Sequence, residues 1–270
     1  MEILVNERLT DVPDGAVIGD VIARVKPDAD VVIVNGFPAG SDAVLAHGDT
    51  VALIRRGEVP RFEELEALLV ARHTPRVHQC VRSATVGIAG VGGLGSAVAV
   101  ALARTGVGRL VIADHDVVEP SNLNRQQYFV DQIGMAKVDA LSANLARINP
   151  YVDIVAHAAR IEPANVARFF SGVDVMVEAF DTPGAKAMLA ETFRTLCRGV
   201  PLVTASGLAG FGPAGAIGVR RAASDLYVVG DERTAAARGS GLMAPRVGVA
   251  AHHQASVVLR LLLGLDPVTE

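Results

Sequence analysis

The stretch from Val86 to Gln126 constrains the fold of this 270-residue chain more than any other part of it. It reads VGIAGVGGLGSAVAVALARTGVGRLVIADHDVVEPSNLNRQ. An apolar run is followed by a glycine-rich turn, a helix-forming run, a second apolar run that ends in Asp114, and a polar cluster. The first four parts, in this order, predict a nucleotide-binding βαβ unit with strands at 86–89 and 110–113 and a helix at 96–104.

The glycines of the turn have a specific use in such a unit. Without Cβ atoms, their backbone turns tightly and approaches a ligand closely. The helix that follows presents unpaired N–H groups and a partial positive charge to a phosphate. Asp114 lies about twenty residues beyond the last glycine, where a carboxylate can accept hydrogen bonds from a ribose. The predicted ligand-binding residues of the turn are Gly90, Gly92, Gly93, Leu94 and Gly95. The alternative is a turn that only packs a helix on a sheet.

The polar cluster after the second strand comprises Asp116 and the run SNLNRQ at 121–126. Ligands of open α/β sheets bind beyond the carboxyl ends of the strands, so a triphosphate would reach this cluster. Arg125 can donate paired hydrogen bonds to phosphate oxygens, and Lys137 can supply a second cation. Asp181 ends a later strand at the same edge and is suited to hold Mg²⁺ through oxygen. Adenylyl transfer needs these charges and hydride transfer does not.

The composition narrows the class of protein. Half of the residues are hydrophobic and the net charge is −4, with no basic stripe, so nothing argues for a nucleic-acid partner. Two cysteines form neither a disulfide framework nor a CxxC pair. The first residues lack the basic and apolar regions of a signal peptide, so we expect a cytoplasmic protein. The uncharged run 83–103 is long enough to cross a bilayer, but its glycines and its separate strand and helix periods argue against a membrane span.

Residues 1–57 predict a small α+β domain of their own, followed by a connector at 58–80 that contains a helix at 61–72. Within the small domain we expect strands at 1–5, 7–12, 31–34 and 51–54 and a helix at 17–25.

From residue 81 to residue 270 strands and helices alternate, which predicts an α/β domain with a mostly parallel, doubly wound sheet. Beyond the first βαβ unit we expect strands at 152–156, 173–179 and 201–205, and helices at 137–148, 163–170, 185–197 and 246–263. Segment 207–218 is expected to form turns around one more strand. Segment 220–246 is polar and is expected to be irregular.

The motifs GVGGLGS, SNLNRQ and GMAKV, with Asp114 and Asp181 at strand ends, resemble the ThiF/MoeB family of bacterial relatives of ubiquitin-activating enzymes. The resemblance covers residues 81–264. It implies a Rossmann-like domain that uses ATP and Mg²⁺ to adenylate the C-terminal glycine of a small β-grasp sulfur carrier, with release of pyrophosphate. Because the family is typically dimeric, the resemblance also implies a homodimer.

The resemblance assigns roles to residues of the polar cluster. Asp114 would hold the ribose, and Asp181 would bind Mg²⁺ and assist catalysis. The residues that would bind or support the phosphates are Asn122, Arg125, Gln126 and Lys137. The catalytic residues predicted on this basis are Arg125, Lys137 and Asp181, and Asp116 is added to the ligand-binding set.

Three further expectations come from comparing this chain with the family's pattern. Family members use an arginine ahead of the first strand, often donated across a dimer, and here Arg72 is the first candidate and Arg76 the second. Many relatives hold a structural zinc with two CxxC pairs, which this chain lacks, so we expect no zinc site and a place in the zinc-free ThiF subgroup. We expect Cys80 and Cys197 to serve packing rather than covalent attachment of a carrier.

The N-terminal module resembles ThiS, the β-grasp sulfur carrier of thiamine biosynthesis. A working carrier ends in a free Gly-Gly, whereas this chain continues from Gly57 into Glu58. Without a terminal carboxylate the module cannot be adenylated. It is therefore interpreted as a vestigial or docking domain, or as a stabilising appendage, and the expected substrate is a separate ThiS/MoaD-like carrier.

Two other functions remain open on sequence alone. The glycine turn and Asp114 also permit an NAD-dependent oxidoreductase, in which Arg125, Lys137 and Asp181 would have no use. A non-catalytic scaffold that binds carrier proteins through the N-terminal module is the other alternative.

Overall fold

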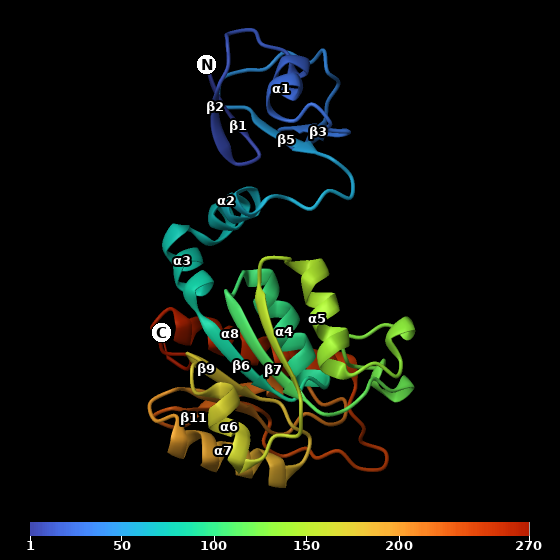
Figure 1. Ribbon diagram of the computed structural model, residues 1–270, viewed down its shortest axis with the longest axis vertical. Coiled ribbons are helices and arrows are strands. Elements are labelled where there is room, and N and C mark those ends of the chain that lie inside the picture. The colour runs from blue at the N-terminus through green and yellow to red at the C-terminus, as the bar shows by residue number, and fades with distance from the viewer. Residues whose placement is uncertain (270) are drawn as a thin grey trace. The chain divides into compact units, whose positions relative to one another are not determined.

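The computed structural model of the protein describes residues 1–269 and contains two compact units, Met1–His78 and Gln79–Glu270 (Figure 1). The finer division into 1–57, 58–80 and 81–270 stays a prediction.

The first unit contains a five-stranded sheet with one helix packed on it (Figure 1). Strands β1 and β5 run parallel, and the other neighbours pair antiparallel. The helix buries its apolar stripe against one face of the sheet, and the two share a core. In spatial order the elements are β2 (Arg8–Asp11), β1 (Glu2–Val5), β5 (Thr50–Ile54), β3 (Val31–Val34) and β4 (Phe37–Pro38), with the helix α1 (Ile18–Val25).

Two elements of the first unit were not predicted. The short strand β4 pairs with β3 across a turn in which Asn35 and Gly36 have φ of 50° and 86°. This is the backbone that an Asn-Gly hairpin turn requires, but two residues give no periodicity to detect. The predicted connector helix is α2 (Phe62–His73), and a second helix, α3 (Pro75–Ser83), follows it directly. Helix α3 was not predicted because its sequence is polar, although Pro75 at its first position is a helix-start signal.

The second unit is a seven-stranded sheet in the order β11-β12-β10-β9-β6-β7-β8. All neighbours are parallel except β11, which runs antiparallel to β12 at the edge. This confirms the predicted doubly wound, Rossmann-like α/β fold. The strands are β6 (Thr85–Ala89), β7 (Arg109–Asp114), β8 (Asp153–Ala158), β9 (Val175–Glu178), β10 (Leu202–Ala205), β11 (Gly218–Ala223) and β12 (Leu226–Gly230).

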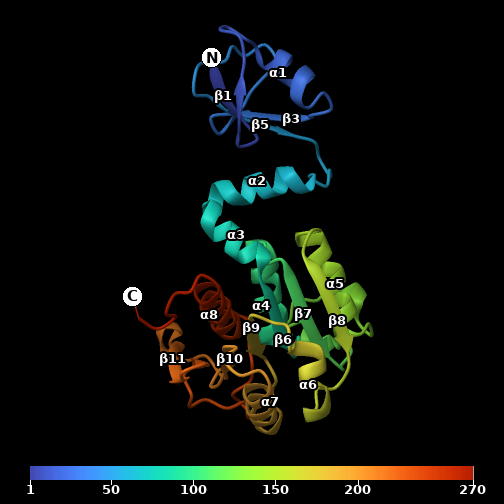
Figure 2. The ribbon, with the colours of Figure 1, turned by 60° about the vertical axis from the view of Figure 1, so that its left-hand side comes forward.

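Helices cover both faces of this sheet (Figure 2). The helices α4 (Gly93–Thr105), α5 (Lys137–Ile148) and α8 (Ala244–Leu262) pack together on one face. The helices α6 (Pro163–Phe170) and α7 (Pro183–Leu196) lie on the other, where Phe170 and Phe193 are fully buried. Apolar strands buried between two helix layers need no alternation of polar residues, which is why they read as continuous apolar runs.

The prediction for residues 207–246 was wrong in its details. Segment 207–218 contains a short 3₁₀ turn at Ala214–Ala216 and no strand before Gly218. The segment expected to be irregular supplies β12 and most of β11. Edge strand β11 keeps polar, exposed side chains such as Arg220 and Arg221, so its sequence resembles a loop.

None of the helices between residues 1 and 269 combines the length and the hydropathy that a membrane span requires.

Candidate functional site

The glycine turn between β6 and α4 has no room for side chains at two positions. Gly90 has a φ of +85°, and a Cβ there would lie 2.9 Å from the carbonyl oxygen of Ala179. A Cβ on Gly95 would lie 1.9 Å from the carbonyl oxygen of Gly90. The turn therefore brings the first N–H groups of α4 close to the ends of β6 and β9, where an anion can approach them.

Asp114, at the end of β7, holds the glycine turn. Its two carboxylate oxygens accept the backbone N–H groups of Val91, at 2.8 Å, and Asp116, at 2.9 Å. Each oxygen keeps a further lone pair, so the half-buried carboxylate can still accept hydrogen bonds from a ligand. The position matches the predicted ribose-binding role, which remains a proposal.

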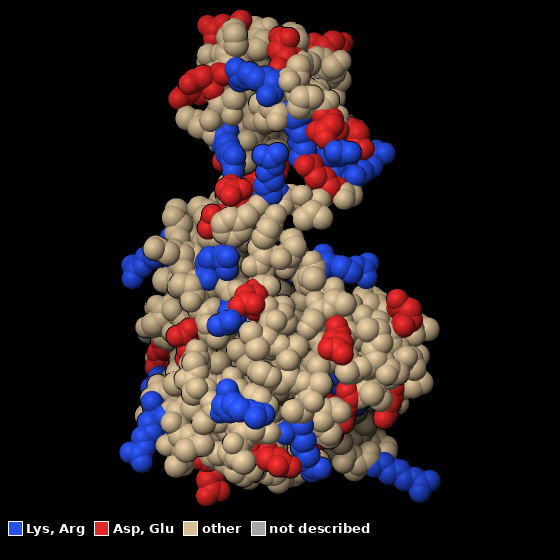
Figure 3. All heavy atoms as spheres, viewed as in Figure 1, with Lys and Arg blue, Asp and Glu red and all other residues tan. Residues whose placement is uncertain are grey.

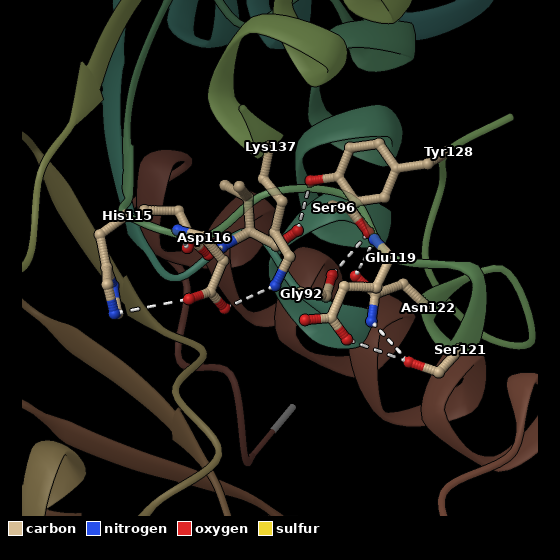
Figure 4. Close-up of polar contacts among 11 residues, drawn as sticks. Gly92, Ser96, His115, Asp116, Glu119, Ser121, Asn122, Tyr128 and Lys137 are labelled. Atoms are coloured by element: carbon tan, nitrogen blue, oxygen red, sulfur yellow. Dashed lines mark hydrogen bonds and ion pairs between the residues drawn. The ribbon is translucent and has the colours of Figure 1, made fainter. Parts of the chain in front are cut away.

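Two side chains that were not predicted fasten the turn to the following loop (Figure 4). The hydroxyl of Ser96 donates to the Gly92 carbonyl at 2.6 Å and accepts from the Gln127 N–H at 3.1 Å. The buried Tyr128 phenol donates to the Val91 carbonyl at 2.7 Å. Burial, reinforced by nearby carboxylates, raises the pKa of Tyr128, so the phenol stays a donor. No periodicity marks these residues, because the backbone atoms of Gln127 and Val91 that they bind are 31 and 37 positions away in the sequence.

Lys137 and Asp116 form an ion pair at this edge (Figure 4). The ammonium of Lys137, whose side chain is 8% exposed, lies 2.7 Å from one oxygen of Asp116. The Nε2 atom of His115 lies 3.4 Å from the other oxygen. The hydrogen bond from Lys137 lowers the pKa of Asp116. Lys137 begins α5, so the pair fixes a cation at the carboxyl edge of the sheet, and two of its N–H donors remain for a ligand.

The loop that carries Arg125 is braced by Asn122. Its Oδ1 accepts from the Glu119 N–H at 3.1 Å, and its carbonyl accepts from the Gln126 N–H at 2.9 Å. The Arg125 guanidinium donates to Asn124 Oδ1 at 2.8 Å and to the Ser121 carbonyl at 3.3 Å. Both acceptors are neutral, so within residues 1–269 no carboxylate pairs with this cation.

Gln126 is buried beside the glycine turn, and its Oε1 has no hydrogen-bond partner among the described residues. Its Nε2 lies 3.8 Å from the place where a Cβ of Gly92 would stand. An unsatisfied buried acceptor costs about 1–3 kcal/mol. A ligand that donates a hydrogen bond at the turn would recover this energy, so the side chain fits a bound molecule.

Asp181 was predicted to end a strand, but it lies three residues beyond the last residue of β9, at the same edge of the sheet. Its side chain is exposed and makes no hydrogen bond or ion pair to any residue from 1 to 269. The residue that ends β9, Glu178, is fully buried and was not predicted, although an acid closing the apolar run VMVE was a signal. Elsewhere at this edge, ligand atoms of Asp114, His115 and Asp116 lie within 4.8 Å of one another, but both carboxylates already accept the hydrogen bonds described above.

Helix α8 begins next to the glycine turn through a buried ion pair. Arg246 lies 2.5 Å from Asp231, with side-chain exposures of 6% and 10%, and it also donates to the carbonyls of Gly212 and Pro213. Its neighbour Val247 would lie 3.1 Å from a Cβ on Gly93. The pair thus ties the loops after β10 and β12 to the helix that backs the turn.

The remaining candidates are two arginines of the first unit and the two cysteines. Arg72 is exposed in α2 of the first unit, 3.6 Å from Glu7, and Arg76 is exposed at the start of α3. That Arg72, or else Arg76, completes the nucleotide site stays a prediction. Cys197 is buried at the end of α7, as predicted, and burial raises the pKa of its thiol. Cys80 is half-buried.

A parallel sheet that brings a glycine turn, a strand-end acid and two cations to one edge defines a nucleotide-binding domain of the Rossmann type. Comparison with known proteins then gives the family. Residues 66–270 match the ThiF family, and residues 1–57 match the ThiS-like ubiquitin family. The chain belongs to the ThiF family, which confirms the resemblance seen in the sequence.

Curated relatives match part of the chain. Over 133 residues it is 37% identical to the tRNA threonylcarbamoyladenosine dehydratase of Bacillus subtilis, covering 48% of this chain and 52% of that protein. Over 129 residues it is 40% identical to the adenylyltransferase and sulfurtransferase uba4 of Aspergillus niger, covering 47% of this chain and 26% of that protein. The chain thus spans about half the length of the first relative and about a quarter of the second.

Among solved structures, TcdA of Escherichia coli, a tRNA N6-threonylcarbamoyladenosine dehydratase in complex with AMP, matches with a TM-score of 0.66 and 25% identity. The match covers 73% of this chain and 93% of that one. The same protein in complex with ATP matches with a TM-score of 0.64. Escherichia coli MccB, at 22% identity and a TM-score of 0.56, shares the fold.

Proposed function

We propose that this protein is an adenylyltransferase that uses ATP to activate the C-terminal carboxylate of a separate, small ThiS-like sulfur carrier. The observation that carries the proposal is the convergence at one sheet edge of the glycine turn, Asp114, and the cations Lys137 and Arg125. The unsatisfied Gln126 oxygen adds a group that is suited to a bound ligand. Support also comes from the TcdA structures with AMP and ATP and from the adenylyltransferase uba4 among the relatives.

The chemistry requires charge stabilisation more than a protein nucleophile. A carboxylate oxygen of the carrier bonds to the α-phosphorus, and the bond from that phosphorus to the bridging oxygen breaks. The electron pair leaves on pyrophosphate, and the product is an acyl-adenylate. In this proposal Lys137 and Arg125 hold the phosphates and stabilise the charge that develops on them, and Asp114 orients the ribose.

Magnesium fits one residue of this edge. The carboxylate of Asp181 is an exposed oxygen donor without a partner among residues 1–269, and oxygen donors are those Mg²⁺ prefers. When bound there, the ion would neutralise phosphate charge. The acids at 114 and 116 are weaker candidates, since both already accept hydrogen bonds within the protein.

The N-terminal module is proposed to dock rather than to serve as the substrate. Residues 54–59 are exposed, and the chain continues past Gly57, so the module offers no terminal carboxylate. Glu58 is instead held 2.6 Å from Lys26. A thiamine-type carrier, a homodimer that supplies Arg72 or Arg76 to the neighbouring site, and a cytoplasmic location complete the proposal.

The test is exchange of labelled pyrophosphate into ATP in the presence of Mg²⁺ and a ThiS-like protein that ends in Gly-Gly. We expect exchange that depends on the carrier and is lost when its last glycine is removed. Lys137→Met should lower the rate by about 10²-fold or more, since it removes a cation from the developing charge. Arg147→Met, an exposed cation on the same helix, is the matched control. Absence of exchange with every Gly-Gly carrier tried, while NAD binds in place of ATP, would refute the proposal.

A second candidate is dehydration of threonylcarbamoyladenosine in tRNA. The specific observation in its favour is the 37% identity to the Bacillus subtilis enzyme. Against it, the net charge is −4, and the face of the second unit seen in Figure 3 carries acidic and basic side chains side by side rather than a basic stripe. Incubation with ATP and tRNA that carries the modification, followed by mass spectrometry of the nucleosides, separates the two: loss of one water favours this candidate.

A further inference from the structure

A polar network lies at the end of β9, three residues before Asp181. The carboxylate of Glu178, fully buried at the end of β9, accepts the Phe180 N–H at 2.6 Å. The ammonium of Lys186, on α7, lies 3.1 Å from both carboxylate oxygens. The hydroxyl of Thr204, on β10, donates to the second oxygen. Three elements of the domain thus meet at one carboxylate.

The network fixes the chain on both sides of Asp181. Before it, the Phe180 N–H is held by Glu178. After it, Thr182 begins α7: its hydroxyl accepts the Ala185 N–H at 3.4 Å and its carbonyl accepts the Lys186 N–H at 3.1 Å. The side chain of Lys186 in turn forms the ion pair with Glu178. Asp181 is therefore the exposed residue between two anchored neighbours, and its own side chain stays available.

The end of strand β9 is equally constrained. The Ala179 N–H donates to the Ala89 carbonyl at 2.9 Å, and the buried Gln254 amide donates to the Glu178 carbonyl at 3.2 Å. A Cβ on Gly90 would lie 3.1 Å from the Phe180 ring. The turn that carries Asp181 is thereby held directly against the glycine turn of the nucleotide site.

A buried carboxylate is a costly way to stabilise a fold, because Glu178 must lose its hydration even though Lys186 keeps 25% of its side chain exposed. Apolar residues of similar volume often stabilise a protein as well or better. An apolar pair, however, could not accept the Phe180 N–H. The charged Glu178 is therefore explained by its hydrogen bond from the Phe180 amide rather than by its contribution to stability.

We propose that the cluster formed by Glu178, Lys186 and Thr204 is a positioning device for Asp181. Glu178 acts through the Phe180 amide and sets where the Asp181 carboxylate stands relative to the glycine turn. The inference rests on the proposed adenylyl transfer for its effect on rate, but the hold on the Phe180 amide can be measured without any reaction.

The decisive variant is Glu178→Leu combined with Lys186→Met, which replaces the pair by apolar groups and leaves no uncompensated charge. We expect a melting temperature close to that of the wild type. The Phe180 amide should exchange with deuterium at least about 100-fold faster, while amides in the middle of β6, such as Ile88, keep their protection. The kcat of pyrophosphate exchange should fall by about 10- to 100-fold, with the KM for ATP changed less than about twofold.

Two comparisons separate positioning from stability. Added to Asp181→Asn, the double replacement should lower kcat by less than about threefold further, because both act through the same carboxylate. Asp225→Asn breaks the other ion pair of α7, to Arg194, and should leave both kcat and the Phe180 amide unchanged. The single variant Lys186→Arg, which keeps the cation, should retain most of the wild-type kcat and most of the protection of the Phe180 amide.

Retained protection of the Phe180 amide in the apolar variant would overturn the inference, as would an unchanged kcat. If the wild type shows no pyrophosphate exchange, the proposed function fails, and the amide measurement still decides whether the cluster holds the turn.

Discussion

Gly95→Ala is the substitution in the glycine turn for which the structure predicts the closest clash. Gly95 is the third residue of α4, where a helix would ordinarily gain about 1 kcal/mol from alanine. Here the added Cβ would lie 1.9 Å from the Gly90 carbonyl oxygen, 2.9 Å from the Gly90 carbonyl carbon and 3.1 Å from the Ile88 side chain. The nearest atom belongs to the backbone and cannot rotate away, so α4 must shift by about 1.5 Å to restore an ordinary contact.

The expected cost follows from this shift. Forcing one methyl into a packed core costs about 1–3 kcal/mol and more where the backbone must move. We therefore expect a net loss of about 2–3 kcal/mol after the helix-propensity gain. For a domain of this size that lowers the melting temperature by about 4–12 °C. Because the helix N-terminus moves away from the turn, ATP binding should be lost in protein that is still folded.

Gly248→Ala is the matched control. Gly248 lies in helix α8, and within residues 1–269 no atom beyond its chain neighbours and the adjacent helix backbone lies within 4 Å of an added Cβ. Alanine there should stabilise the protein by about 0.5–1 kcal/mol and leave ATP binding intact. Differential scanning calorimetry and titration calorimetry with ATP measure both effects. A Gly95→Ala protein as stable as the wild type, with the same ATP affinity, would contradict the steric argument.

Three further predictions follow from buried groups. Burial opposes ionisation of Asp231, but hydrogen bonds from Thr234, Arg233 and Arg246 outweigh it and lower its pKa to about 2. The charged form therefore contributes about 2 kcal/mol to the free energy of unfolding above pH 4, and this contribution is lost as the pH falls toward 2. In urea unfolding, the stability of Asp231→Asn should depend less on acid pH than that of the wild type, and an equal dependence would disprove the prediction. Cys197, whose thiol pKa is raised by burial, should resist iodoacetamide at pH 8 until the protein is unfolded. Mass spectrometry measures this labelling, and rapid labelling of the native protein would show that the thiol is accessible. Gln126→Leu removes an unsatisfied buried acceptor, so the free protein should be no less stable while ATP affinity falls about tenfold; equal affinity would mean that no ligand uses the Gln126 oxygen.

The local signals of the nucleotide site could be read from sequence because each is a local rule. A strand buried on both faces reads as an apolar run, and a turn with φ of +85° at Gly90 needs glycine. The strand-end position of Asp114 follows from those runs, whereas Glu178, and not Asp181 as predicted, ends the later strand. Since the carboxyl ends of parallel strands share one edge, the order of elements was enough to bring these residues together.

Other parts of the fold, β11 and α3 among them, could not be predicted from the sequence. The edge strand β11 has polar, exposed side chains, and its strand conformation depends on pairing with β12. The helix α3 likewise has a mixed polar sequence. The strand conformation of β11 therefore depends on a partner rather than on local preference, whereas the polar sequence of α3 gives no clear apolar stripe to detect.

The amino-acid sequence by itself determined the class of fold, the glycine turn and the charged residues at the strand ends, because periodicity and backbone sterics act within a few residues. Only the tertiary structure decided which groups support them: Tyr128 and Ser96 on the turn, Asp116 beside Lys137, and Glu178 with Lys186 below Asp181. Apart from the bond of Ser96 to Gly92, four positions away, these contacts join residues from 8 to 37 positions apart. Hydrogen bonds and ion pairs have directions and short ranges, so they exist only once packing has brought the partners together.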